Sequence, residues 1–378
     1  MSRAGGNPLR RTIAVLAVVA TLVLLISQAR GDPGEERLVL LGTYHSIGHG
    51  FDVEGDFAYV GTSHGIEIYN VTRTSNVRPI ERHHMDQPMM DVVLDGSLLY
   101  ATSSWYGVYV FDVSNPYNVT EVSHTYWHGH GSSTFRGIER FDDFLCVGTF
   151  NDTGAEIAIL DVSDPNNLTL VSTLPYDRFV TDCEYWNGYL YVLAGFEGLR
   201  VLDVSDPYNP QEVGHLDTEG IPREIAFHGN TAFVADYDGG LLILDMSDPL
   251  NPADTWYRYE YGAKVYSVFP TDELLFVGDQ HGLRVYDRTS QGQIIEREFY
   301  NYSGSPIGGW EVNDIEVIGS RVYTMDGGFS IFEFQEPEYY IPIELPFFLL
   351  PAAFAAVVVA ALWWRSRKGG EIIPPKRL

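Results

Sequence analysis

Two cysteines are all that this chain of 378 residues contains, and they form neither a CxxC pair nor a Cys/His spacing typical of a metal site. The sequence also has no Ser/His/Asp order, no nucleophile elbow, no phosphate-binding glycine loop and no dinucleotide fingerprint. An enzyme can assemble its site from several separate loops, so these absences exclude no reaction. They favour a binding protein over an enzyme.

Basic residues are scarce in the central part of the chain. Residues 32–344 contain 15 of the 24 Lys and Arg but 50 of the 51 Asp and Glu, a formal net charge of −35, and their only lysine is Lys264. Such an acidic surface argues against nucleic acid and anionic lipid as partners, and it favours cations or basic ligands. Adaptation to salty surroundings explains the same charge without any ligand.

No helical periodicity interrupts the central part, and a short β-rich segment recurs there instead. Its best copy is GLRVLDVSDP at residues 198–207, with close copies at residues 107–116, 156–165 and 240–249. Weaker copies begin at Gly65, Gly282 and Gly328, which makes seven copies spaced 42 to 49 residues apart. Two apolar runs precede each copy and another follows. The pattern predicts an all-β fold, a seven-bladed β-propeller of four-stranded antiparallel blades, with strands A (innermost) to D (outermost).

The turn that ends the repeated segment supports this phasing. In Asp206-Pro207-Tyr208-Asn209 the aspartate comes first and proline second, as a type I turn prefers, and similar tetrads occupy residues 115–118, 164–167 and 248–251. The aspartates also invite a calcium interpretation, but they lack the alternating ligand pattern of a calcium loop. We therefore interpret them as turn residues.

These repeats resemble a known family. The run YLYVLAGFEGLRVLDVSDPYNPQEVGHL at residues 189–216 and its copies look like the LVIVD-repeat family of surface β-propeller proteins, over residues 38–335. The resemblance implies the propeller fold, but it implies no particular activity and no catalytic residues. The first, sixth and seventh copies depart from the turn pattern.

The two ends of the repeat region predict how the ring closes. LVLLGTY at residues 38–44 resembles a D strand with no A to C strands before it, and the seventh blade ends at its C strand. We expect the first strand to complete the last blade, because closure removes an exposed sheet edge.

Both ends of the chain predict membrane targeting. Residues 1–29 resemble a signal peptide, or a retained signal anchor. A nine-residue linker, 336–344, leads to an uncharged run at residues 345–364 that is long enough to span a bilayer, and a basic tail, 365–378, follows. The positive-inside rule predicts a single-pass cell-membrane protein with a cytoplasmic tail and an extracellular propeller, residues 38–335. Five glycosylation sequons occur in that part: Asn70, Asn118, Asn151, Asn167 and Asn301.

Histidines gather on neighbouring predicted loops. In this phasing the D–A and B–C loops share one face, which we call the top, and the first three D–A loops carry six histidines: His45, His49, His83, His84, His128 and His130. They predict a site for a divalent transition-metal ion. Solvated loop histidines are the alternative, since no spacing among them is diagnostic.

A second group of candidate residues lies where the A strands begin, nearest the central channel. Four acids and two arginines are predicted there: Asp91, Asp182, Glu224, Asp314, Arg136 and Arg223. The loops nearby add Trp105, Trp127 and Trp310, which suit a recognition surface. These residues predict a polar pocket for a small ligand or a peptide, with ordinary solvation of strand ends as the alternative.

Cys146 and Cys183 occupy core positions, one on a B strand and one on the next blade's A strand. If the two positions lie opposite one another in an A–B hairpin, both side chains point the same way round the ring. This placement predicts two buried free thiols and no disulfide.

These features predict a membrane-anchored surface module that binds a ligand or mediates adhesion through its top-face loops. The alternative is a metal-dependent surface enzyme, hydrolase-like, that uses the histidine-rich site. The extracellular partner can be a protein, a glycan or a small ligand.

Overall fold

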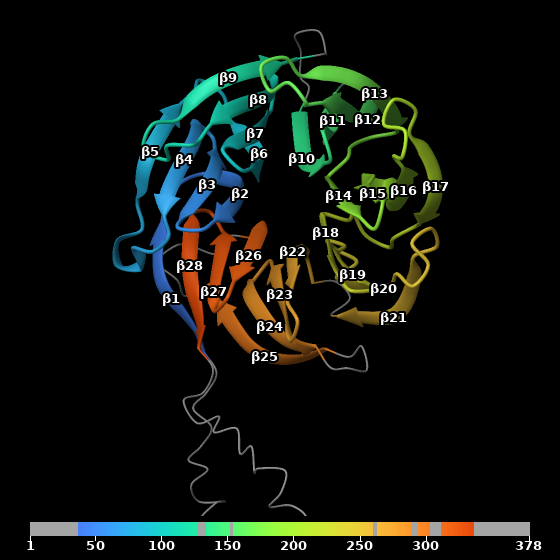
Figure 1. The fold of residues 1–378 in the computed structure, drawn as a ribbon. Helices are drawn as coiled ribbons and strands as arrows, with labels where there is room; N and C mark the ends of the chain where they lie inside the picture. Colours follow the sequence, from blue (N-terminus) through green and yellow to red (C-terminus); the bar gives the residue numbers. More distant parts are fainter. Residues whose placement is uncertain are drawn as a thin grey trace, which may run out of the picture. The chain divides into compact units, whose positions relative to one another are not determined.

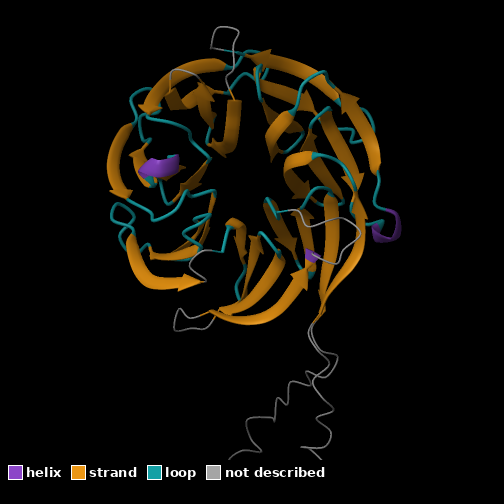
Figure 2. Cartoon of the chain, turned by 180° about the vertical axis from the view of Figure 1, so that it is seen from behind, coloured by secondary structure: helices purple, strands orange, loops and turns teal. Residues whose placement is uncertain are grey.

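The computed structural model describes residues 37–126, 134–151, 154–259, 263–288, 294–302 and 311–335. These residues form seven four-stranded antiparallel sheets, arranged as a ring of blades around a central channel (Figure 1). Seen from behind, strands again make up nearly all of the ring, with two short 3-10 helices, η1 (Thr74–Asn76) and η2 (Gly195–Glu197) (Figure 2). The predicted all-β, seven-bladed propeller is confirmed.

Each blade uses its strands in chain order from the channel outward, except for the last. Blade 1 comprises β2 (Gly48–Glu54), β3 (Phe57–Thr62), β4 (Gly65–Asn70) and β5 (Pro79–His84). Blade 2 comprises β6 (Met89–Asp95), β7 (Leu98–Ser103), β8 (Gly107–Asp112) and β9 (Thr120–Thr125). Blade 3 comprises β10 (Thr134–Phe141), β11 (Phe144–Asn151), β12 (Gly154–Asp161) and β13 (Thr169–Tyr176).

The remaining blades follow the same order. Blade 4 comprises β14 (Asp182–Trp186), β15 (Tyr189–Leu193), β16 (Leu199–Asp203) and β17 (Gln211–Leu216). Blade 5 comprises β18 (Glu224–His228), β19 (Thr231–Ala235), β20 (Leu241–Asp245) and β21 (Ala253–Tyr259). Blade 6 comprises β22 (Val265–Pro270), β23 (Leu274–Asp279), β24 (Gly282–Arg288) and β25 (Ile294–Asn301). Blade 7 comprises β26 (Asp314–Ile318), β27 (Arg321–Met325), β28 (Phe329–Gln335) and, as its outer strand, β1 (Arg37–Tyr44).

The ring closes as predicted, with the first strand completing the last blade. β1 pairs antiparallel with β28 from Arg37 opposite Gln335 to Tyr44 opposite Phe329. Leu38 is buried in the interface between blades 6 and 7. The first and last residues of the ring therefore lie side by side.

The turns after the C strands have the predicted type I hydrogen bonds. The N–H of Asn209 donates to the carbonyl of Asp206 over 2.9 Å, and the N–H of Tyr208 donates to the Asp206 carboxylate over 3.2 Å. The same pattern occurs at residues 115–118, 164–167 and 248–251. The aspartates are thus used as acceptors within the turns.

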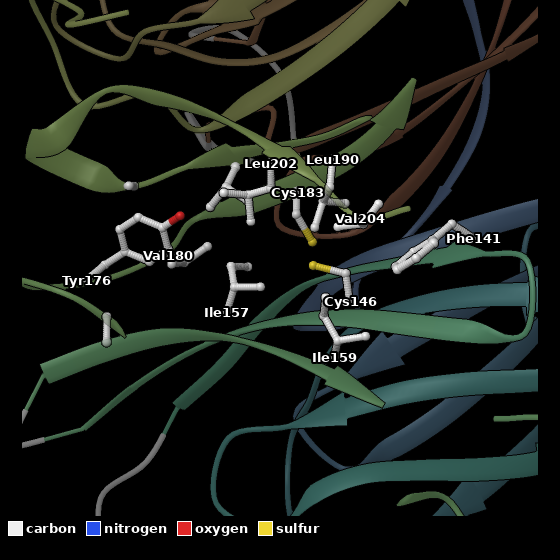
Figure 3. Close-up of a cluster of buried hydrophobic side chains, with 13 residues drawn as sticks. Phe141, Cys146, Ile157, Ile159, Tyr176, Val180, Cys183, Leu190, Leu202 and Val204 are labelled. Atoms are coloured by element: carbon white, nitrogen blue, oxygen red, sulfur yellow. The ribbon is translucent and has the colours of Figure 1, made fainter. Parts of the chain in front are cut away.

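The core consists of side chains packed between neighbouring blades. In each interface, a B-strand residue of one blade shares a buried cluster with an A-strand residue of the next, because each blade has both faces covered. The interface of blades 3 and 4 brings together Cys146 from β11 and Cys183 from β14, both free and buried (Figure 3). The predicted burial of both thiols is confirmed.

The predicted orientation of these thiols is wrong. Cys146 lies opposite Glu139, whereas Cys183 lies opposite Val192. The position equivalent to Val192 in blade 3 is Val147, next to Cys146. Adjacent residues of a strand point to opposite faces, so the one-residue difference turns Cys146 toward blade 4 and Cys183 toward blade 3.

The predicted signal segment (residues 1–29), linker (336–344), membrane span (345–364) and tail (365–378) lie outside the described residues. Among the residues that the structure describes, no helix has the length and apolar character needed to cross a membrane.

Candidate functional site

The innermost strands of the blades line a central channel, a cavity of about 610 Å³. Within the described ranges, its lining has eight carboxylates, one arginine, Arg223, and one histidine, His49. The acids form two rings, because residues two apart on an A strand lie on the same face. The upper ring consists of Asp91, Asp182, Glu224 and Asp314, and the lower ring of Asp52, Glu139, Glu184 and Glu316.

The upper ring contains the four acids that the sequence predicted for the channel. The lower ring was missed, although its members follow the upper positions by two residues in blades 4 and 7. Side chains two residues apart on an inner strand lie on the same face, so Glu184 could have been predicted from Asp182, and Glu316 from Asp314. Blades 1 and 3 carry an acid only at the lower position, because their upper position is a glycine, Gly50 or Gly137.

The carboxylates connect neighbouring blades by accepting backbone hydrogen bonds. Asp91 accepts from the N–H of Ile138 over 3.2 Å, and Asp314 accepts from the N–H of Phe51 over 3.0 Å. In the lower ring, Asp52 accepts from the N–H of Leu94 over 2.8 Å.

The hydrogen-bonding pattern of the sheets explains why carboxylates occupy these positions. Each A strand is a sheet edge, so its outward N–H groups have no partner strand and need another acceptor. Part of the acidity of the channel is therefore structural, since the acids hold adjacent blades together.

Burial raises the pKa values of seven of the eight acids. It raises the pKa of Asp182 to about 8, with repulsion from Asp91 as a further cause. The pKa of Glu139 rises to about 7 and that of Glu316 to about 9, in both cases first because of burial. The pKa values of Glu224 and Asp314 are raised in the same way. At neutral pH the channel therefore retains protons, which a bound cation can displace.

A basic cluster lies at the mouth of the channel, between blades 5 and 6. Tyr237, on the loop from β19 to β20, has the guanidinium carbon of Arg223 4.7 Å from its ring centroid and the Nζ of Lys264 4.9 Å away. A hydrogen bond with Lys264 lowers the pKa of the Tyr237 phenol. Beside them, the Tyr266 hydroxyl donates to Glu311 over 2.5 Å. Of this cluster, the sequence predicted only Arg223.

Three other predicted ligand-binding residues have no described side chain. Trp127 and Trp310 lie outside the described residues, and Arg136 contributes its backbone to β10 while its side chain is not described. Trp105 lies on the loop between β7 and β8 with 51% of its surface exposed. It lines no part of the channel, so it is available to a partner only at the top surface.

The predicted metal site is not assembled in the described part of the chain. His83 and His84 belong to the outer strand β5, not to a loop, and His49 belongs to β2. The ring of His84 packs edge-on against that of His64, with centroids 5.9 Å apart. Among the described residues, which include His45 but neither His128 nor His130, no group of three or more His, Cys, Asp or Glu side chains can hold a metal ion.

The glycosylation candidates differ in exposure. Asn118, Asn167 and Asn301 are exposed, and Asn70 is half-buried at the end of β4. The Asn70 side chain accepts from the N–H of Thr72 over 3.0 Å. The side chain of Asn151 lies outside the described residues.

The fold and the channel place this protein among the closed seven-bladed propellers. Its channel is lined by acids and has a basic cluster at its mouth. A family model described as the LVIVD repeat matches residues 89–125, 140–174, 184–218 and 219–254. The match covers four repeats and is consistent with the LVIVD-repeat β-propeller that the sequence indicated. Such a fold with these repeats suggests a protein-interaction module.

Similar solved structures support the fold alone, because their sequence identities are low. A chain in the mitotic checkpoint complex has a TM-score of 0.61 at 14% identity, with 80% of this chain and 93% of that one covered. The propeller domain of Cps50 (Swd1) from Myceliophteria thermophila has a TM-score of 0.59 at 14% identity, covering 79% and 100%. BamB from Moraxella catarrhalis has a TM-score of 0.51 at 16% identity, covering 76% and 84%. No curated protein matches the chain.

Proposed function

We propose that this protein is a surface interaction module that binds a positively charged segment of a partner protein at the top of its channel. The observation that carries the proposal is the lining of the channel, where eight carboxylates face a single arginine among the side chains that the structure describes. A lysine or arginine side chain that enters from the top meets Asp91, Asp182 and Asp314 first. It gains charge-assisted hydrogen bonds there, in a site that is partly shielded from water.

The basic cluster at the mouth restricts the side from which a cationic segment can approach the channel. Arg223 and Lys264 lie on the side of blades 5 and 6, and they repel a cationic segment that approaches over Tyr237. The segment is thereby directed toward blades 1 to 4, where the exposed Trp105 offers an aromatic contact.

The binding test uses the full-length chain and a hexalysine peptide, titrated by calorimetry at pH 8.5 and low salt. Replacing Glu139→Gln removes one channel charge, and we expect about tenfold weaker binding, roughly 1.4 kcal/mol. Asp206→Asn removes an equal charge from a bottom turn where blade 2 already has asparagine, at Asn115, so it serves as the matched control. Equal weakening by both variants means general surface attraction and contradicts the proposal.

The same titration has a pH signature. Because the channel acids have raised pKa values, a bound cation displaces their protons, and affinity is expected to increase from pH 6 to pH 9. Proton release is measured by repeating the calorimetry in two buffers of different ionisation enthalpy. A hexaglutamate peptide is the negative control.

In the proposed setting the propeller stands outside a cell membrane with its bottom face toward the lipid. The support is that the ring ends where β28 pairs with the start of β1, at Gln335 and Arg37, and that only nine residues, 336–344, separate it from the apolar run. The top mouth then faces away from the membrane, within reach of a partner.

Cysteine labelling on intact cells tests this orientation. A cysteine at Trp105, on the top, should react readily with a bulky impermeant maleimide, whereas one at Tyr208, on a bottom turn, should react several-fold more slowly. Both side chains are exposed in the ring, at 51% and 60%, so a difference reports the membrane and not burial. The reverse ranking contradicts the orientation.

A further inference from the structure

The two cysteines occupy a contact that every blade interface repeats. One B-strand residue of each blade shares a buried cluster with one A-strand residue of the next blade. The six other pairs are Tyr59 with Val92, Tyr100 with Ile138, Tyr191 with Ile225, Phe233 with Val268, Phe276 with Ile315 and Tyr323 with Phe51. In the interface of blades 3 and 4, both members of the pair are cysteine. The only two thiols of the chain thus replace the two halves of one repeated contact.

The backbone brings the two thiols close together. Gly137, with φ +56°, lies so near blade 4 that a Cβ there would be 2.7 Å from the Cα of Asp182. The Sγ of Cys183 lies 3.9 Å from the carbonyl oxygen of Gly137. A hydrogen bond of 3.3 Å from the N–H of Tyr185 to Glu139 holds the same two strands together further down. Figure 3 shows the two sulfur atoms directed toward each other across the interface.

We propose that Cys146 and Cys183 form an intramolecular disulfide that links blades 3 and 4. The oxidant is a low-molecular-weight disulfide such as oxidised glutathione. One cysteine thiolate attacks it, giving a mixed disulfide and releasing one small thiol. The second cysteine then attacks the protein sulfur of the mixed disulfide, and the second small thiol leaves. In sum, the two protein thiols lose two electrons and two protons, and the small disulfide accepts them and becomes two small thiols.

The surroundings determine when this bond forms. Both cysteines are buried, and burial raises the pKa of each thiol, so little thiolate exists in the folded ring. Exchange with a small disulfide therefore takes place during folding or when the blades open locally. Once formed, the bond is shielded from reductants by Ile157, Ile159 and Leu202 of the same cluster. The extracellular setting proposed above would supply the oxidising conditions in which disulfides persist.

The bond closes a loop between residues 146 and 183 and constrains the unfolded chain. Full-length protein is unfolded and refolded either in a glutathione redox buffer or in reducing buffer, then denatured and alkylated. We expect no alkylated thiol in the first sample, two in the second, and a 146–183 cross-linked peptide in non-reducing digests. The melting temperature should be about 5–10 °C higher for the oxidised protein.

Two variants separate the cross-link from other oxidation. Cys183→Val restores the residue that blade 2 has at this position, so the ring should fold but lose the redox-dependent shift in melting temperature. The double variant C146V/V147C moves the thiol by one residue, to the opposite face of β11, and should remain reduced in the same buffer. Two alkylated thiols after oxidative refolding of the wild type, or only glutathione adducts or intermolecular links, overturn the proposal.

Discussion

Removing residues 32–46 is expected to unfold the whole propeller, and not merely to shorten it. Those residues contain β1, which completes blade 7 by pairing with β28 along its length. Leu38 and Leu40 pack in the interface with blade 6, and Leu41 and Tyr44 pack in the interface with blade 1. Leu38 is buried and the other three side chains are partly buried. Since a fully buried apolar side chain contributes about 1.5–3 kcal/mol, their combined loss is a large fraction of the roughly 5–15 kcal/mol that holds a typical domain folded.

The measurement is a thermal melt followed by circular dichroism, with wild-type and truncated chains at equal concentration. We expect the truncated chain to lose its cooperative transition, or to melt more than about 10 °C lower. A chain that begins at residue 32 retains β1 and is the matched control, and it should melt like the full-length protein. If the 32–46 deletion melts at the wild-type temperature, the closure of the ring through β1 contributes little stability and our interpretation is wrong.

The second large effect is expected from pH. The folded pKa values of Glu139, Asp182 and Glu316 are raised to about 7, 8 and 9, above the values near 4 that these acids have in an unfolded chain. Between those limits the folded ring binds more protons than the unfolded chain. Its free energy of unfolding therefore decreases as pH rises from about 4 to about 9.

The aspartates of the turns cause stability to decrease at low pH. Hydrogen bonds from the serines two residues later lower the pKa values of Asp161, Asp203 and Asp245. These groups stabilise the fold above pH 4, and their contribution is lost as pH falls through their lowered folded pKa values. The channel and the turns together predict a melting temperature that is highest in mildly acidic buffer and decreases toward pH 9.

We expect the melting temperature to fall by about 5 °C or more between pH 5 and pH 9. Asp182→Asn removes one of the titrating groups and keeps an oxygen that accepts the N–H of Cys183, but its amide nitrogen no longer accepts the 3.4 Å hydrogen bond from the N–H of Ile225. The variant should therefore show a flatter profile than the wild type between pH 5 and pH 9, whatever its absolute melting temperature. Asp203→Asn changes a turn group that titrates below this range, and its slope between pH 5 and pH 9 should equal that of the wild type. If the melting temperature of the wild type does not change between pH 5 and pH 9, ionisation of the channel acids does not destabilise the fold and the prediction is wrong.

Much of the fold could be predicted because the signals that specify it are local. A strand pattern repeated every 42 to 49 residues sets the number of blades, and Asp-Pro at a fixed place sets the turns. The upper ring of Asp91, Asp182, Glu224 and Asp314 was predicted for the same reason, since each occupies the first inner position of its repeat. Contacts that depend on pairing between strands were harder to predict from the sequence. The thiols are an example, because an error of one residue in one hairpin register reversed the predicted direction of the Cys146 side chain.

The sequence by itself determined a propeller of seven blades, its closure by residues 38–44, and an acidic channel mouth, because repeat period, turn chemistry and residue type are properties of short segments. Only the tertiary structure decided that Cys146 and Cys183 face each other, that a second ring of acids lies below the first, and that Arg223 and Lys264 meet over Tyr237. It also placed His83 and His84 on an outer strand. The physical reason is that these contacts join separate blades, and their geometry depends on strand register and on how closely neighbouring inner strands approach, which no single repeat encodes.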